Sequence, residues 1–522
     1  MKLKGKQILS GLLVTALCLG SSASVFAAGQ EGVYWPTFRK DNSNMAIVDT
    51  TLPITNEPLK EKWNQSFYKP GVQGTVSEPI VLGENLYVVA GKNINRMDKA
   101  TGEILNQGTL VSSVGFFSRA TYGDGKIFVP VNAGIIQAFD ATTLESLWCT
   151  ERVKNAQTLC QVTYDNGYLY TGYWQGGSNT GKFFAVDTNA QTVTSTDPKL
   201  DQPIMPKKWE SADNGGFYWS GATVTGNIVV FGGDSGTLYA VNRETGEAID
   251  TYQTKGKIRS CITQSAEGNF YFTAGEGDFE GASNDGFIYK VGMDESGHFT
   301  EPAEAMLEMP STCNPMVYNG RVYVPMGKTF NATDLSDVSI FNATDLSKLY
   351  DVEMPGCSKS SPLLTTAYAT PENNQTVYLY LTLNNEKGQI VRIEDNETNT
   401  TPKMQIVYTP ELPDKSPNNN CTGSLVSDAE GTLYYHNDNG HLIALTGTSV
   451  SMMMGDVDED KEITSFDALM TLQASVGKIE LLGDQIAIAD VDGDKEITSF
   501  DALLILQYSV GKITEFPSKG GQ

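Results

Sequence analysis

Apolar and polar residues alternate with the two-residue period of β-strands over most of the chain, and one short phrase keeps returning. The phrase runs through a small or aromatic turn, an alternating strand, a glycine-bearing loop, a second strand and a Thr-Gly-like turn. Its clearest copies are PIVLGENLYVVAGKNINRMDKATGEIL (79–105) and TVTGNIVVFGGDSGTLYAVNRETGEAI (223–249). Aromatic and β-branched runs such as Leu86-Tyr87-Val88-Val89 favour strands, and turn residues such as Asn319-Gly320 separate them.

Eight copies of this phrase can be recognised, and we expect each to form one blade of a propeller. They lie at residues 79–105, 121–148, 163–193, 223–249, 268–291, 319–350, 376–393 and 431–445. Their spacing of roughly 40 to 50 residues is the period of a four-stranded blade. The pattern therefore predicts a mainly-β fold, an eight-bladed β-propeller over residues 33–446.

The last copy stops after its third strand, near Leu445, so its blade lacks an outer strand. The segment Leu59-Lys60-Glu61-Lys62-Trp63-Asn64 near the start of the chain reads as an outer strand without a blade of its own. We predict that this N-terminal strand completes the final blade and closes the ring, which removes an exposed sheet edge.

The pattern changes after a short linker, residues 447–454, into two near-copies of an acidic loop followed by a helix. The copies are DVDEDKEITSFDALMTLQASVGKI (456–479) and DVDGDKEITSFDALLILQYSVGKI (490–513). They differ at four positions: Glu459/Gly493, Met470/Leu504, Thr471/Ile505 and Ala474/Tyr508. Apolar residues after each loop keep helical spacing, and Gly477 and Gly511 are expected to end the helices. The sequence leaves no evident room for a helix before each loop.

Each loop places oxygen-bearing side chains at positions 1, 3, 5, 9 and 12, which is the spacing of a calcium loop. Glu462 and Glu496, at position 7, would add main-chain carbonyls. We therefore expect two calcium ions. The predicted ligands are Asp456, Asp458, Asp460, Glu462, Thr464 and Asp467 in the first loop, and Asp490, Asp492, Asp494, Glu496, Thr498 and Asp501 in the second.

A doubled half-EF-hand of this kind, residues 455–515, closely resembles a type I dockerin, the module that docks proteins onto scaffoldin cohesins in cellulosomes. The resemblance implies a cohesin of a scaffoldin as the partner. It also implies contact through loop positions 10 and 11 and through residues late in each helix. These residues are Ser465, Phe466, Gln473, Lys478, Ser499, Phe500, Gln507 and Lys512. The two phenylalanines could instead belong to the core, which the sequence leaves open.

The propeller repeat resembles that of pyrroloquinoline-quinone-type propellers, as in Ala138-Phe139-Asp140-Ala141-Thr142-Thr143 and Ala240-Val241-Asn242-Arg243-Glu244-Thr245-Gly246. The resemblance speaks for the fold, whereas a bound quinone is disfavoured, because the adjacent Cys-Cys pair of those dehydrogenases does not occur here. The tryptophan that ends each repeat is recognised only at Trp63 and Trp148. Many relatives with this repeat act as scaffolds.

The connections that share one face of such a propeller carry aromatic and acidic residues, which is how proteins recognise carbohydrate. The candidate ligand face contains Trp174, Phe217, Tyr218, Trp219, Asp278 and Glu280, and we add Phe116, Phe117 and Trp209 as further aromatics there. The alternative is that these rings fill gaps between blades. Six cysteines follow residue 28, and they read either as inter-blade disulfides or as buried thiols.

Residues 1–28 read as a signal peptide, with a basic head, an apolar run and small residues before the cleavage point. Removing it lowers the formal net charge from −25 to about −28, which repels nucleic acid and anionic lipid. We therefore expect a secreted, extracellular protein with neither a nucleic-acid nor a membrane partner, held at a cell surface only through a scaffoldin.

These patterns together predict a secreted component of a cellulosome-like, polysaccharide-degrading complex. Its dockerin would bind a cohesin, and its propeller would bind carbohydrate, such as plant polysaccharide, or a protein. The alternative is a propeller-fold glycoside hydrolase or polysaccharide lyase carried by the same dockerin. The sequence contains no catalytic motif and only three histidines, none in a metal-ligand or triad-like spacing, so it neither shows nor rules out an enzyme.

Overall fold

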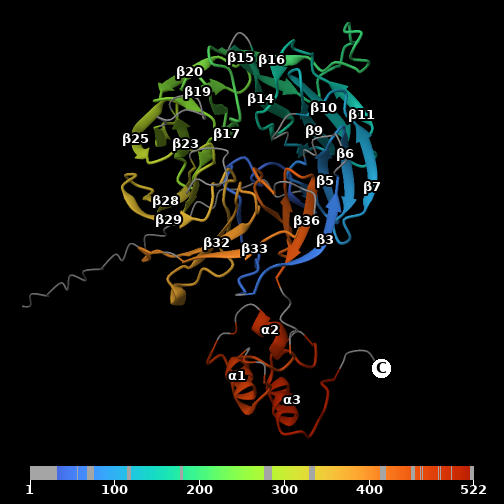
Figure 1. The fold of residues 1–522 in the computed structure, drawn as a ribbon, viewed down its shortest axis with the longest axis vertical. Coiled ribbons are helices and arrows are strands. Elements are labelled where there is room, and N and C mark those ends of the chain that lie inside the picture. The colour runs from blue at the N-terminus through green and yellow to red at the C-terminus, as the bar shows by residue number, and fades with distance from the viewer. Residues whose placement is uncertain are drawn as a thin grey trace, which may run out of the picture.

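The computed structural model describes residues 32–517. Gaps in this description lie at 56, 68–75, 115–118, 177–179, 276–284, 328–335, 402, 412–418, 448–452, 459, 461, 480, 482–483 and 495. Within these residues, strands occupy the chain from Val33 to Thr446 and the α-helices follow from Ser465. Figure 1 shows the strands arranged as a ring of sheets and the helices gathered beside it.

The described residues form eight sheets of four or five strands, which confirms the predicted eight-bladed propeller. Blade 1 contains β4 (Ile80–Leu82), β5 (Asn85–Ala90), β6 (Asn93–Asp98) and β7 (Ile104–Thr109). Blade 2 contains β8 (Thr121–Gly123), β9 (Lys126–Val131), β10 (Ile135–Asp140) and β11 (Ser146–Cys149). Blade 3 contains β13 (Thr163–Asp165), β14 (Tyr168–Gln175), β15 (Thr180–Asp187) and β16 (Lys207–Asp213). Blade 4 contains β17 (Thr223–Thr225), β18 (Ile228–Gly232), β19 (Thr237–Asn242) and β20 (Ala248–Gln253).

The second half of the ring repeats the same order. Blade 5 contains β22 (Thr263–Gln264), β23 (Phe270–Gly275), β24 (Gly286–Met293) and β25 (Phe299–Leu307). Blade 6 contains β26 (Met316–Tyr318), β27 (Arg321–Pro325), β28 (Ser336–Asn342) and β29 (Lys348–Met354). Blade 7 contains β30 (Leu363–Thr365), β31 (Val377–Thr382), β32 (Ile390–Asp395) and β33 (Lys403–Tyr408), with η1 (Pro371–Asn373) before β31. Blade 8 contains β34 (Val426–Ser427), β35 (Leu433–His436) and β36 (His441–Thr446).

The fourth strand of blade 8 comes from the other end of the propeller sequence, as predicted. Strand β3 (Lys60–Ser66) pairs antiparallel with β36, from Lys60 opposite Thr446 to Ser66 opposite His441. The sheet order is therefore β3-β36-β35-β34, with β3 in the outer position. Since β36 is now flanked on both sides, blade 8 exposes no unpaired edge along that strand.

A tryptophan in the outer strand of one blade packs on the Thr-Gly turn of the next. The Trp63 indole donates to the carbonyl of Lys99 at 3.0 Å, and a Cβ added to Gly102 would lie 2.7 Å from the Trp63 ring. Trp209 in β16 repeats this arrangement at Gly246, and its indole donates to the Arg243 carbonyl at 2.9 Å. Placing Trp209 on the ligand face was therefore wrong, because the ring is buried between blades 3 and 4.

Residues 33–48 occupy the inside of the ring, which the repeat pattern does not predict. Strand β1 (Val33–Trp35) adds to the inner strand β4 of blade 1, and β2 (Ile47–Val48) adds to the inner strand β30 of blade 7. Between them Arg39 is fully buried, and its guanidinium donates to the carbonyl of Ser361 at 3.1 Å.

The side chain of Asn44 links this inner segment to two further blades. Its Nδ2 donates to the carbonyls of Ala222 and Ile262, at 3.1 and 2.9 Å, next to the inner strands of blades 4 and 5. The inner segment thus connects blades 1 and 7 through strand pairing and blades 4 and 5 through hydrogen bonds to main-chain carbonyls.

The six described cysteines are buried free thiols, so the disulfide interpretation is wrong for them. They are Cys149, Cys160, Cys261, Cys313, Cys357 and Cys421. Burial raises the pKa of Cys261 to about 11, and its thiol donates to Gln161 Oε1 at 2.9 Å. These thiols therefore behave as small buried side chains with weak hydrogen bonds.

The C-terminal helices pack around a small core of their own. They are α1 (Ser465–Ser475), α2 (Asp484–Ala489) and α3 (Ser499–Ser509). The core contains Val457, Leu481, Ile488 and Ile505, with α1 against α3. Helix α2 directly precedes the second acidic loop, so the expectation of no helix before the loops is wrong there. Among the described residues, none of the helices has the length and apolar character needed to cross a membrane.

The packing of Trp63 makes ring closure testable. Trp63→Ala removes a large ring from the seam between blades 8 and 1, and we expect the free energy of unfolding of the propeller to fall by about 2–4 kcal/mol. Chemical unfolding followed by circular dichroism measures this change. Lys62→Ala, an exposed neighbour in the same strand, is the matched control and should stay within about 0.5 kcal/mol of the parent. Equal unfolding midpoints for the two variants would contradict the role of the Trp63 side chain in closing the propeller.

Candidate metal centre and docking face

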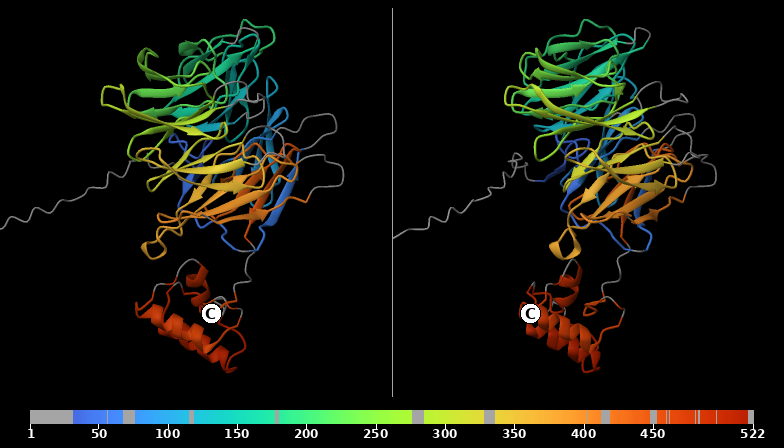
Figure 2. Two further views of the ribbon diagram at one scale, coloured as in Figure 1. Left: turned by 60° about the vertical axis from the view of Figure 1, so that its left-hand side comes forward. Right: turned by 90° about the vertical axis from the view of Figure 1, so that its left-hand side faces the viewer.

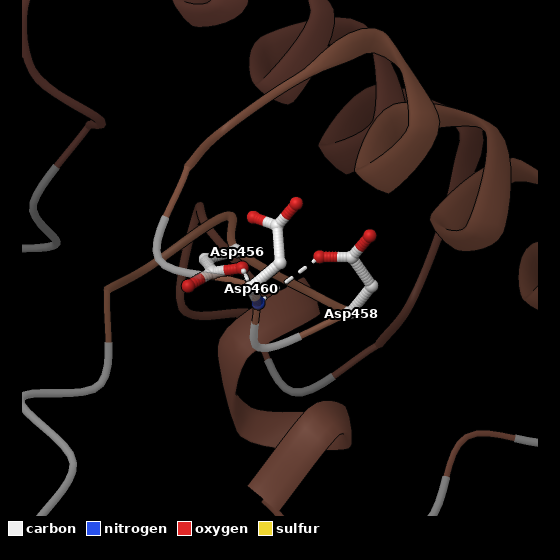
Figure 3. A group of neighbouring side chains, drawn as sticks. All are labelled: Asp456, Asp458 and Asp460. Carbon is white, nitrogen blue, oxygen red and sulfur yellow. Dashed lines mark hydrogen bonds between the residues drawn. The ribbon is translucent and has the colours of Figure 1, made fainter.

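The first acidic loop gathers its carboxylates around one point. The main-chain N–H of Asp460 donates to Asp456 Oδ1 at 3.1 Å and to Asp458 Oδ1 at 3.2 Å (Figure 3). One oxygen from each of these three aspartates lies within 4.8 Å of the others. Oxygens bound to one calcium ion at 2.3–2.6 Å lie at most about 5 Å apart, so this spacing fits that ion.

The second loop has the same geometry. The N–H of Asp494 donates to Asp490 Oδ1 and Asp492 Oδ1, both at 3.0 Å. Their three carboxylates again lie within 4.8 Å of one another. Position 4 of this loop is Gly493, whose φ of 70° lies in the left-handed region that favours glycine.

The aspartate at position 12 connects each loop to its helix. Asp467 is fully buried, and its Oδ1 accepts from the N–H groups of Val457 and Asp458 at 2.7 and 3.1 Å. Its Oδ2 accepts from the N–H and hydroxyl of Thr464, the residue that caps α1. Asp501 and Thr498 repeat the cap at the start of α3. Through this cap each loop is hydrogen-bonded to the first turn of its helix.

The clustered carboxylates of each loop repel one another, which favours binding of a cation. Partial desolvation and the nearby carboxylates of Asp467 and Asp460 raise the pKa of Asp458, and Asp492 is affected in the same way by Asp501 and Asp494. A divalent cation would remove this repulsion and stabilise the ionised form. Glu462 and Glu496 are exposed, which agrees with a main-chain contribution from position 7.

An apolar stripe covers the outer surface of α1 and α3. Phe466 is 55% exposed and Phe500 is 52% exposed, so neither phenylalanine belongs to the core. Three more apolar residues of each helix are exposed beside them: Leu469, Leu472 and Val476 in α1 and its C-cap, and Leu503, Leu506 and Val510 in α3 and its C-cap. The predicted contact residues Ser465, Lys478, Ser499 and Lys512 are exposed too, and Gln473 and Gln507 are half-buried.

The differences between the two repeats avoid this stripe. Thr471, Leu504 and Ile505 are buried, and the remaining helical differences, Met470, Ala474 and Tyr508, are partly buried. Tyr508 stacks on Phe516 with ring centroids 4.8 Å apart. The two exposed stripes are therefore identical in sequence. Leu469, Leu472 and Val476, with their counterparts, are docking candidates that the sequence interpretation missed, and this conservation between copies was the available signal.

The candidate ligand face of the propeller divides into three groups. Phe217 is fully buried among the rings of Phe183 and Phe231, so it fills the gap between blades 3 and 4. Trp174, Tyr218 and Trp219 are partly exposed and lie together. The rings of Tyr218 and Trp174 meet edge to face, with their centroids 5.8 Å apart. Phe116, Phe117, Asp278 and Glu280 lie outside the described residues.

An arginine that the sequence interpretation missed joins this cluster. The Arg259 guanidinium lies 4.6 Å from the Tyr218 ring centroid. It donates to the Asp234 carboxylate from Nε at 3.0 and 3.2 Å and from Nη2 at 2.6 Å. Asp234 belongs to the β18–β19 connection and Arg259 to the segment before β22, so local sequence spacing could not join them.

Comparison with known proteins supports both parts of the chain. Residues 454–508 match the family described as the dockerin type I domain. A search of curated proteins found no match.

Solved structures resemble the propeller at low sequence identity. The quinohemoprotein alcohol dehydrogenase from Comamonas testosteroni has a TM-score of 0.55 at 12% identity, covering 80% of this chain and 81% of that one. A europium-containing methanol dehydrogenase has a TM-score of 0.51 at 14% identity, covering 78% and 89%. The quinohemoprotein alcohol dehydrogenase ADHIIG from Pseudomonas putida HK5 has a TM-score of 0.50 at 13% identity, covering 80% of each chain. At these identities the likeness shows the fold alone.

The described residues leave one small cavity beside the inner segment. Trp35, Phe38 and Arg39 of the inner segment pack there against Glu78 and Arg119. The cavity between them measures about 10 Å³, which is at the lower limit for one water molecule. The described residues at this place do not fit a quinone, and we derive no chemistry from one.

The buried cap predicts which carboxylate matters most for folding of the loop. Asp467→Asn weakens an acceptor that serves four donors, so we expect the C-terminal domain to lose about 2–3 kcal/mol of stability and the first loop to bind calcium more weakly. Calorimetric calcium titration and thermal unfolding measure the two effects. Glu462→Gln is the control, because its exposed carboxylate should not be a ligand. A stronger effect of Glu462→Gln than of Asp467→Asn would contradict the assigned geometry.

Proposed function

We propose that this protein, whose residues 454–508 form a dockerin type I domain, is a secreted component of a cellulosome-like complex. It docks onto a scaffoldin cohesin through the α1–α3 surface and carries its propeller as a polysaccharide-binding module. The observation that carries the proposal is the identical exposed stripe on the two helices. An apolar surface led by two half-exposed phenylalanines is costly in water and suits a protein interface.

Two identical stripes offer a cohesin two equivalent ways to dock. Each stripe presents a serine and phenylalanine at the helix start, leucines along the helix, and a lysine just beyond its end. All the differences between the repeats within the helices, including Thr471/Ile505 and Ala474/Tyr508, are on the packed side. A rotation that exchanges α1 and α3 would therefore present the partner with the same side chains.

Calcium is the switch for this surface in the proposal. Each loop would bind one ion through Asp456, Asp458, Asp460, Thr464 and Asp467, or through their counterparts Asp490, Asp492, Asp494, Thr498 and Asp501, with the carbonyls of Glu462 and Glu496 completing the sets. Binding free energy at such sites contributes directly to folding of a small domain. Without metal, the clustered carboxylates repel one another and the helices lose the loops that orient them.

Metal removal tests the docking role directly. In excess EDTA we expect the full-length protein to lose cohesin binding, because the loops that orient α1 and α3 need calcium. Surface plasmon resonance on an immobilised type I cohesin measures the binding, and re-addition of calcium should restore it. Circular dichroism should show the propeller strands unchanged. Cohesin binding that persists at full strength in EDTA would defeat the proposal.

The equivalence of the two stripes predicts an unequal response to single and double substitutions. Either Phe466→Ala or Phe500→Ala alone leaves one intact stripe, so we expect less than about fivefold weaker cohesin binding. The double variant removes both anchors and should bind at least about 100-fold more weakly. Surface plasmon resonance on the immobilised cohesin measures the two single variants and the double variant, with Glu462→Gln as the control. Full loss of binding in either single variant would show that only one stripe docks.

A further inference from the structure

A cluster of aromatic side chains lies where the connections of blades 3, 4 and 5 meet on one face of the propeller. Trp174 comes from the end of β14, and Tyr218 and Trp219 come from the connection between β16 and β17. The Tyr218 and Trp219 rings lie 4.7 Å apart, and Trp174 meets Tyr218 edge-on. All three side chains are partly exposed, so the cluster lies at the surface and is accessible to solvent.

The backbone at this cluster is strained. Trp219 has a φ of 62°, in the left-handed region, although it carries a large side chain. This conformation costs on the order of 1 kcal/mol for a non-glycine residue, and such strain is retained mainly at functional sites. The segment is held by its surroundings, since a Cβ added to Gly216 would lie 2.9 Å from the Trp174 ring.

Charged groups around the rings are already matched. The Arg259 guanidinium lies 4.6 Å from the Tyr218 ring centroid and 5.8 Å from that of Trp219, and it pairs with the side chain of Asp234. The nearby Asp213 carboxylate accepts from the N–H of Gly215 at 2.7 Å and from the Tyr239 hydroxyl at 2.7 Å. Lys257 is also close enough to act on Asp234, so the two cations Arg259 and Lys257 balance the two carboxylates Asp213 and Asp234. The site is thus locally neutral, although the whole chain has a net charge of −25.

We propose that this cluster is a binding site for a neutral pyranose chain, in which Trp174, Tyr218 and Trp219 stack on sugar rings beside the charge-balanced Arg259–Asp234 pair. This inference rests on the proposed role of the propeller as the polysaccharide-binding cargo of the dockerin. Sugar C–H faces suit aromatic planes, and a guanidinium whose charge is already balanced adds no net charge that would favour an ionised sugar.

The same features select against other ligands. A uronate chain would need an unmatched cation, whereas Arg259 is neutralised by Asp234 and the protein as a whole repels polyanions. A protein partner would need about 800 Å² of complementary surface, and the cluster is a few rings fixed by strain and packing. Rings fixed in place lose little entropy on binding, which suits a small ligand with few contacts.

Calorimetric titration of the full-length, calcium-loaded protein tests the site with cellohexaose, xylohexaose, mannohexaose and hexagalacturonate. We expect at least one neutral hexasaccharide to bind and to change the tryptophan fluorescence. We expect hexagalacturonate not to bind. Tyr218→Ala and Trp174→Ala should each weaken binding at least about tenfold, and the milder Trp174→Phe should give a smaller loss.

The matched control is Tyr378→Ala. Tyr378 is also a half-buried tyrosine with an arginine beside its ring, Arg392 at 5.5 Å, but it belongs to blade 7. The control should bind glycan like the parent, and circular dichroism should confirm the fold of every variant. If the alanine variants fail to fold, the Trp174→Phe titration and the fluorescence change of the parent decide the question.

Several results would overturn the site. They are the absence of binding by all neutral hexasaccharides, binding of hexagalacturonate alone, unchanged affinity in the Trp174 and Tyr218 variants, or an equal loss in Tyr378→Ala. Cohesin binding measured on the same preparations separates the two proposals. Intact cohesin binding without glycan binding removes the site and leaves the docking role, whereas glycan binding without cohesin binding does the reverse.

Discussion

Pairing of β3 with β36 is the interaction on which the propeller depends, because it makes the first and last parts of the sheet sequence one blade. The outer position of blade 8 is filled along the whole of β36, from Thr446 back to His441. Trp63 in the same strand then packs on the Gly102 turn of blade 1. One short strand thus completes a sheet and fixes the seam to the next blade, so no blade is left at an open end of the ring.

The inner segment adds a second constraint of a different kind. Residues 33–48 reach inner strands of distant blades through main-chain hydrogen bonds and the buried side chains of Arg39 and Asn44. A buried arginine needs several acceptors, and carbonyls near the inner strands supply them here. Among the described residues, the inner segment therefore occupies part of the interior of the ring.

Local periodicity explains which features could be predicted from the sequence. The blades and the loop–helix repeats follow from spacings within a few dozen residues, and the closing strand follows from a last repeat that lacks its outer strand. Trp209 was misplaced because the long insertion between β15 and β16, bridged by Val193 and Ile204, separates it from the repeat to which it belongs. The inner segment and the Arg259–Asp234 pair depend on contacts between blades, which no local pattern records. The sequence likewise could not decide whether Phe466 and Phe500 are exposed, because that depends on how α1 packs on α3.

The route by which the C-terminal domain leaves the propeller has a mechanical consequence. The C-terminal domain follows directly after β36 in the sequence, so a pull on its helices acts on the end of a strand held on both flanks by β35 and β3. Such a load shears all its ladder hydrogen bonds together instead of opening them one at a time. Force applied at the C-terminal domain is therefore resisted at once by the ladders on both sides of β36.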